Sequence, residues 1–182
     1  VPGFGPTACG PCAVTNSLVY LQNRYPNVYG NNLVPPQASD WDASGTVDFY
    51  DDMIDVALTL AGSDYMDQDL VDGTFHDMLI FGKEKYIEER VPNKTIYSAQ
   101  DYFEWSEART GVPKPDYVDD LMSPTWEFLY DNLLSGEDIE ILLSFFAGGG
   151  HYVTLSSFHF EDANEDGNIQ EDENAWIDFL TH

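Results

Sequence analysis

The sequence predicts an α+β protein in which the helices come first and an antiparallel sheet comes last. Apolar residues recur at helical spacing up to about residue 135, and most strand-like runs follow after residue 138. Hydrophobic residues make up 43% of the chain, which is enough to build a buried core. A length of 182 residues suits one domain, so residues 1–182 are expected to form a single domain.

Helices are expected where apolar residues recur every three or four positions. In the first of them, Val14, Leu18 and Leu21 lie on one face, which predicts a helix buried in the core. The serine and proline at residues 123–124 are expected to begin the last, because serine accepts an early backbone N–H and proline suits the first turn. The expected helices span residues 10–23, 47–60, 74–89, 99–109 and 125–134.

Strands are expected where short runs rich in valine, threonine and aromatic residues are bounded by turn residues. A symmetric hairpin of the last two would place Asp178 opposite Ser157, and the partner of His151 just past His182. The expected strands span residues 95–98, 139–146, 152–160 and 175–181. Three of these four lie near the C-terminal end, and we expect them to form the sheet.

The net charge of the chain limits the kinds of molecule that the protein is expected to bind. The chain has 33 acidic and 7 basic residues, a formal net charge of -26. Such a surface repels phosphates, so neither a nucleic acid nor an anionic membrane is an expected partner. No apolar run approaches the ~18 residues of a membrane span. The composition is typical of a solvated acidic surface in a secreted or halophilic protein, and it leaves the oligomeric state open.

A cysteine and a distant histidine form the first chemical pattern. In the run GPTACGPCAVTNSLVYL, a Gly/Pro turn places Cys9 at the start of the first expected helix. Unpaired backbone N–H groups and the helix dipole favour a thiolate there. Far downstream, His151 stands at the start of an expected strand. A thiolate and an imidazole that relays its proton are the two groups that a cysteine hydrolase needs.

The residues Cys9-Gly10-Pro11 and Gly150-His151-Tyr152-Val153 resemble the papain-like cysteine peptidases, especially the branch that processes bacteriocin leaders at a double glycine. The intervening residues 124–146, a helix, a turn and an apolar strand, also resemble that branch. The resemblance implies a papain-like fold, with Cys9 as nucleophile and His151 as general base and acid. It also implies a peptide or protein substrate whose peptide or isopeptide bond is cleaved through a thioester.

Two alternatives concern the cysteines. Cys12 matches the second cysteine of the papain pattern Cys-Gly-small-Cys, although the Gly-Pro after Cys9 favours Cys9. The run CGPC also spells the thioredoxin redox motif, and a thiol-disulfide redox protein is the third functional hypothesis. A thioredoxin-like fold places a βαβ portion before this motif, whereas only eight residues precede Cys9. The two thiols could still oxidise to a disulfide.

A non-catalytic calcium-binding interaction or adhesion module on a degenerate peptidase fold is the second functional hypothesis. The peptidase superfamily commonly has a glutamine six residues before the nucleophile, where this chain has Gly3 for Cys9 and Pro6 for Cys12. Thr181 stands near the position of the family's orienting acid. His76 and His159 are interpreted as structural histidines, one on a helix and one on a strand face.

A twelve-residue acidic run, DANEDGNIQEDE, matches the EF-hand calcium loop at each diagnostic position. Glycine falls at loop position 6 for the sharp turn, and an apolar residue falls at position 8. Both flanks are expected strands, so the ion would fix a hairpin tip. Extracellular calcium suits weak loops of this kind, which predicts an extracytoplasmic, secreted protein whose signal is not present in this chain. The expected ligands are Asp162, Asn164, Asp166, Asn168 and Glu173.

A second, weaker calcium loop matches the run DWDASGTVDFYD, with glycine at position 6 and valine at position 8. Serine at position 5 and aspartate at position 12 depart from the pattern. The alternative is an acidic N-cap region for the helix that follows. The tentative ligands are Asp40, Asp42, Ser44 and Asp51.

Overall fold

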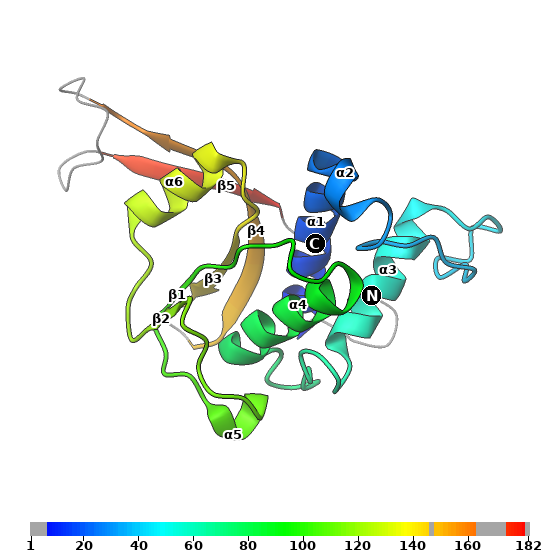
Figure 1. Ribbon diagram of the computed structural model, residues 1–182, viewed down its shortest axis with the longest axis horizontal. Coiled ribbons are helices and arrows are strands. Elements are labelled where there is room, and N and C mark those ends of the chain that lie inside the picture. The colour runs from blue at the N-terminus through cyan, green and yellow to red at the C-terminus, as the bar shows by residue number, and fades with distance from the viewer. Residues whose placement is uncertain (1–6, 146–147, 163–173, 181–182) are drawn as a thin grey trace.

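The computed structural model describes residues 7–145, 148–162 and 174–180 (Figure 1). It is a mixed helix and sheet structure, which confirms the α+β class. The helices are α1 Cys9–Arg24, α2 Pro26–Tyr29, α3 Phe49–Ala61, α4 His76–Arg90, α5 Glu107–Thr110 and α6 Trp126–Ser135. The strands are β1 Ala99–Asp101, β2 Val118–Asp120, β3 Glu140–Ser144, β4 Gly150–Phe160 and β5 Ala175–Leu180. No helix in these described ranges is long and apolar enough to cross a bilayer.

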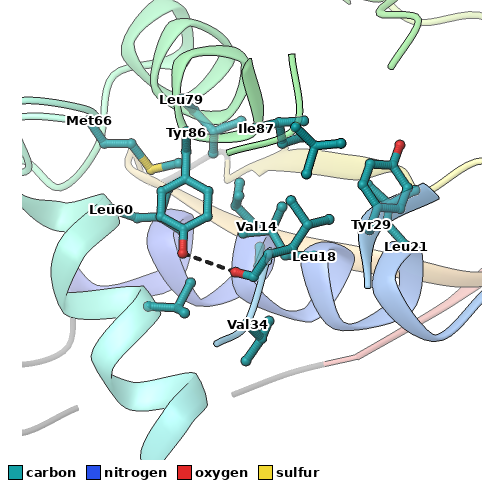
Figure 2. Close-up of a cluster of buried hydrophobic side chains, with 14 of the residues drawn as sticks. Val14, Leu18, Leu21, Tyr29, Val34, Leu60, Met66, Leu79, Tyr86 and Ile87 are labelled. Atoms are coloured by element: carbon teal, nitrogen blue, oxygen red, sulfur yellow. Dashed lines mark hydrogen bonds between the residues drawn. The ribbon is translucent and has the colours of Figure 1, made fainter. Parts of the chain in front are cut away.

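Helix α1 lies between α3 and strand β4 (Figure 1). The apolar face expected for this helix is confirmed, because Val14, Leu18 and Leu21 are almost wholly buried. Side chains from α3 and α4 pack against it and complete the main core (Figure 2). The buried hydroxyl of Tyr86 donates a hydrogen bond of 3.0 Å to the carbonyl oxygen of Leu33, so this polar atom is satisfied inside the core.

The C-terminal strands form an antiparallel sheet in the order β3-β4-β5. Ser157 pairs with Asp178, as the symmetric hairpin predicted. The register then shifts by one between Leu155 and Ser157, so that Leu155 pairs with Phe179. An extra residue on one strand of a pair is a bulge, which bends the strand and increases its twist. The bulge bends β4 between the hairpin tip and the strand's start.

One predicted helix is wrong. Residues 99–109 form β1, a turn and the short helix α5 rather than one helix. The expected strand 95–98 is displaced, because it is Ala99 that pairs with Val118 of β2 in a small parallel sheet. The carboxylate of Asp101 also accepts a hydrogen bond of 3.1 Å from the backbone N–H of Phe103. Pairing with a strand far along the chain therefore overrides the local helical spacing.

The start of α6 also differs from the expectation. Its N-cap is Thr125, whose side chain accepts a hydrogen bond of 3.1 Å from the backbone N–H of Phe128. The serine at residue 123 makes no cap. Threonine caps a helix through the same kind of hydroxyl as serine. The sequence therefore predicted a hydroxyl cap for this helix but assigned it to the wrong residue.

Candidate functional site

Cys9 is the first residue of α1, and its side chain is partly buried. The N-cap residue, Ala8, supplies no side-chain hydrogen bond, and the first turn of the helix holds no acidic residue. The partial positive charge of the helix start is therefore not neutralised from within α1.

Helix α1 and strand β4 run in the same direction where they touch. Near the middle of the helix, the hydroxyl of Thr154 donates a hydrogen bond of 2.9 Å to the carbonyl oxygen of Ala13. One turn earlier, Cys9 packs against the buried cluster that contains Tyr152. Burial raises the pKa of Tyr152, and the nearby charges of Asp101 and Cys9 raise it further. The Cys9 end of α1 therefore lies by the end of β4 where the strand begins.

His151 is the second residue of β4 and pairs with Leu143 of β3. Its side chain is partly buried. Within the described ranges, the ring of His151 makes no hydrogen bond or ion pair, and none joins it to Cys9. The structure thus brings the start of α1 and the start of β4 together, and within the described ranges the side chains of Cys9 and His151 make no direct polar contact.

Cys12 lies one turn after Cys9, and neither cysteine is in a disulfide. Burial raises the pKa of the Cys12 thiol, and the neighbouring Cys9 raises it further. A raised pKa reduces the thiolate fraction at neutral pH, and the thiolate is the reactive form. Of the two cysteines, Cys9 is therefore better placed to act as a nucleophile.

A histidine–carboxylate pair near the start of α1 was not predicted from the sequence. Nδ1 of His76, the first residue of α4, lies 2.5 Å from a carboxylate oxygen of Asp101 at the end of β1. The ring of His76 also stacks on Phe103, with centroids 4.9 Å apart. A Cβ added to Gly10 would stand 2.9 Å from Thr74, so the start of α4 lies against the start of α1.

His76 does lie on a helix, as the sequence analysis expected, but it is part of a polar pair. Twenty-five residues separate it from Asp101. No local motif links the two positions, and residue 101 was expected inside a helix. The only sequence signal was a histidine at the start of a helix, which does not reveal its partner.

His159 is on β4, as expected, with an exposed ring that stacks on Trp176. Its Nε2 lies 3.0 Å from the hydroxyl of Ser157 and 3.2 Å from Asp178. The Ser157 hydroxyl itself donates to Asp178 over 2.6 Å. Both contacts of the imidazole use the same nitrogen, whereas a serine-histidine-aspartate relay uses the two nitrogens separately. This cluster is therefore a surface hydrogen-bond network on the hairpin.

A cavity of about 390 Å³ lies between α4, α6, β1 and β3. The lining residues include His76, Lys83, Asp101 and Tyr152. A cavity of this volume, lined by both polar and apolar residues, is typical of sites that bind a small molecule or a side chain.

Lys83 carries most of the positive charge at this cavity. Its ammonium group contacts Asp138 at 2.5 Å and Glu140 at 2.8 Å. Burial alone lowers the pKa of Lys83, but attraction to the two carboxylates outweighs burial, so the pKa is raised. Conversely, burial raises the pKa of Glu140, and Lys83 opposes that shift. The three groups form a buried ion cluster that ties α4 to β3.

Three carboxylates of the tentative calcium loop come together. One oxygen each from Asp40, Asp42 and Asp51 lie within 4.8 Å of one another, and this cluster could hold a metal ion. Gly45 has a φ of +88°, as the sharp turn of a calcium loop requires at position 6. The hydroxyl of Ser44 instead donates a hydrogen bond of 2.9 Å to the carbonyl oxygen of Thr46.

The alternative interpretation of this loop also holds in part. Asp51 is fully buried and accepts hydrogen bonds from the backbone N–H groups of Trp41 and Asp48. Asp48 is the N-cap of α3 and forms a capping box with Asp51. Backbone hydrogen bonds from Ser44 lower the pKa of Asp42. The loop therefore both caps α3 and gathers three carboxylate side chains at one point.

Most of the stronger calcium loop, residues 163–173, lies outside the described residues, so its ligands Asn164, Asp166, Asn168 and Glu173 are not placed. The strands on both sides are placed and pair as expected. The backbone N–H of Glu161 donates to the carbonyl oxygen of Asn174 over 2.9 Å, and the side chain of Asn174 donates back to Glu161. The loop that begins at Asp162 is thus closed at its base by a hairpin.

Comparison of the chain with protein-family models, with curated proteins and with solved structures found no match. The interpretation of the site therefore depends on its own residues and geometry.

Proposed function

We propose that the protein is a cysteine hydrolase of the papain-like type, with Cys9 as nucleophile and His151 as general base and acid. The observation that carries this proposal is the position of Cys9 at the uncapped start of α1, beside the start of β4. His151 is the second residue of β4, next to Tyr152, and within the described ranges its ring makes no hydrogen bond or ion pair that would compete with a contact to the thiolate.

The reaction would be acyl transfer from a peptide or isopeptide bond to water. The Cys9 thiolate attacks the carbonyl carbon, and backbone N–H groups at the start of α1 stabilise the resulting oxyanion. The intermediate then collapses to a thioester, while the imidazolium of His151 gives its proton to the leaving amine. Water attacks the thioester, His151 takes up its proton, and the acid product leaves Cys9 as a thiolate.

Alkylation by a peptide-like electrophile tests this function across pH. Fast modification of Cys9 below pH 7 that is lost in His151→Ala supports a thiolate-imidazole pair. Cys9→Ser should abolish both the modification and any hydrolysis of a peptide library. Modification of Cys9 at the rate of an ordinary thiol would overturn the proposal and leave the second candidate.

That second candidate is a non-catalytic binding or adhesion module with the same fold. The residues at the family's glutamine and acid positions favour it, since Gly3, Pro6 and Thr181 can supply neither group. A thiol-disulfide redox role for Cys9 and Cys12 is the third candidate, and the raised pKa of Cys12 does not favour it.

We further propose that Asp40, Asp42 and Asp51 bind a calcium ion, and that the loop from Asp162 to Glu173 binds calcium as well. Carboxylate oxygens are the ligands that this ion prefers. The ion would stabilise the loop before α3 and the hairpin that continues β4. Weak loops of this kind suit the calcium concentrations outside cells, which supports an extracytoplasmic location.

A further inference from the structure

The cavity between α4, α6, β1 and β3 combines acidic groups, aromatic rings and one unsatisfied hydroxyl. We propose that it binds an organic cation, an ammonium or guanidinium group on an apolar stem such as a lysine or arginine side chain. This site is distinct from the thiol chemistry at Cys9, which does not line the cavity.

Acidic groups outnumber basic ones around the cavity. Lys83 is shared between two of the carboxylates, and the imidazole of His76 pairs with a third. The acidic lining residues are Asp101, Glu137, Asp138 and Glu140. Four carboxyl groups therefore line the cavity against one lysine and one histidine, and a bound cation would reduce this imbalance.

The titration of Glu137 agrees with this excess of negative charge. Burial raises its pKa, the nearby charge of Asp138 raises it further, and Lys83 lowers it. A raised carboxyl pKa means that the ionised form is disfavoured where it stands. Glu137 is exposed, so water screens its charge, and the shift gives only the sign of the potential at this edge of the cavity, which favours a cation.

Aromatic side chains form much of the remaining wall. A ring face attracts a cation through its quadrupole, and rings beside carboxylates are a common way to bind ammonium groups. Apolar side chains of the cavity would meanwhile cover the stem of the ligand. Besides Tyr152, the lining residues with a phenyl or phenol ring are Tyr97, Tyr102, Phe103, Tyr117 and Phe128.

The hydroxyl of Tyr152 is the independent observation that points to a ligand. Tyr152 lines the cavity, is only 6% exposed, and has no hydrogen-bond partner for its hydroxyl oxygen. A buried polar atom without a partner costs about 1–3 kcal/mol, so such atoms usually have one. The oxygen can accept a hydrogen bond from an ammonium or guanidinium group placed beside Asp101.

The volume of about 390 Å³ admits one such side chain and excludes larger folded partners. Because Tyr152 also packs in the cluster that Cys9 contacts, a basic residue held here would lie near the thiol. If the proposed hydrolase function is correct, this cavity would select substrates with a lysine or arginine close to the cleaved bond.

Equilibrium binding to the Cys9→Ser protein tests the site without any turnover. The probes are N-acetyl-arginine amide and N-acetyl-citrulline amide, which have nearly the same shape and differ in charge. Titration calorimetry should show the arginine probe binding at least about tenfold more tightly, a difference of ~1.4 kcal/mol. Equal affinities, or no binding of the arginine probe at 20-fold molar excess over ~1 mM protein, would overturn the proposal.

Two variants locate the binding within the protein. Glu137→Gln and Tyr152→Phe should each weaken the arginine probe about five- to tenfold, because each removes one group facing the cation. Glu127→Gln on the exposed side of α6 removes the same charge outside the cavity and should leave the affinity unchanged. An equal loss of affinity in Glu127→Gln would show that the probe is attracted to the acidic surface in general, and would overturn the proposed site. Circular dichroism confirms that each variant is folded, and the alkylation test of Cys9 remains independent of the result.

Discussion

The hydroxyl of Thr154 on β4 donates a hydrogen bond of 2.9 Å to the carbonyl oxygen of Ala13 on α1, across 141 residues of sequence. Both residues are buried, so the bond is protected from water. It ties the helix that begins with Cys9 to the strand that begins beside His151. This hydrogen bond links the N-terminal helix to the C-terminal sheet beside the proposed site.

Replacing Thr154 with valine tests the strength of that link. The shape is nearly conserved and the hydroxyl is lost, so unfolding free energy should fall by about 1 kcal/mol. Urea denaturation measures the change. Thr59→Val is the matched control, because the hydroxyl of Thr59 makes a similar bond of 2.9 Å on the exposed face of α3. A loss no larger than in this control would contradict the importance of the buried bond.

The two cysteines should differ in reactivity. At pH 7.5, roughly a unit below an ordinary thiol pKa, iodoacetamide is expected to modify Cys9 several times faster than Cys12. The physical reason is that burial raises the pKa of Cys12 and lowers its thiolate fraction. Peptide mapping by mass spectrometry at short times gives both rates from one sample. Faster modification of Cys12 would reverse the assignment of the nucleophile.

Removing Lys83 should destabilise the protein strongly at neutral pH. Lys83→Met leaves Asp138 and Glu140 as uncompensated buried carboxylates, a change that costs about 3–5 kcal/mol. The loss should shrink below pH 5, because the raised pKa of Glu140 lets it take up a proton early. Lys85→Met is the control, since its exposed pair with Glu89 is worth less than about 1 kcal/mol.

The same ion cluster predicts that the unmutated protein loses stability at high pH. The pKa of Lys83 is higher in the folded state than in the unfolded state, where it is ~10.4. The contribution of Lys83 to the free energy of unfolding is therefore complete below its unfolded-state pKa. It is lost as the pH rises through its folded-state pKa. Denaturation between about pH 10.5 and about pH 12 should show the onset of this loss in the unmutated protein and not in Lys83→Met, and equal profiles would contradict it.

Calcium should raise the melting temperature. A ligand at 100 times its Kd adds about 2.7 kcal/mol to folding, and excess chelator removes that contribution. Asp42→Asn and Glu173→Gln should each reduce the difference between calcium and chelator, while Asp116→Asn, an exposed residue outside both loops, should not. Equal melting temperatures with calcium and with chelator would mean that neither loop binds the ion.

Gly82 should not tolerate a side chain. In α4, a Cβ at this position would lie 2.7 Å from Cγ of Met66 and 2.9 Å from the carbonyl carbon of Tyr65. Gly82→Ala should therefore lower the free energy of unfolding by about 1–3 kcal/mol, although alanine is the better helix former by about 1 kcal/mol. Thermal melts show whether Gly82→Ala is less or more stable than the unmutated protein. A more stable variant would contradict the prediction and show that the turn at Tyr65 moves to accept the methyl group.

The sequence by itself determined the features that depend on local spacing. The buried face of α1, the position of Cys9 at its start, and the pairing of Ser157 with Asp178 were all predicted. Helical periodicity and the alternation of strands act over a few residues, so they can be read along the chain. The calcium patterns belong to the same class, and part of one is now seen as three gathered carboxylates.

Only the tertiary structure decided which distant groups meet. Residues 99–101 became a strand because β2 was available to pair with it, and that strand carries Asp101 to His76. The cavity and the unsatisfied hydroxyl of Tyr152 arise in the same way, from four elements that converge. Local propensities amount to tenths of a kcal/mol per residue, whereas burial and pairing contribute more, so contacts between remote segments override them.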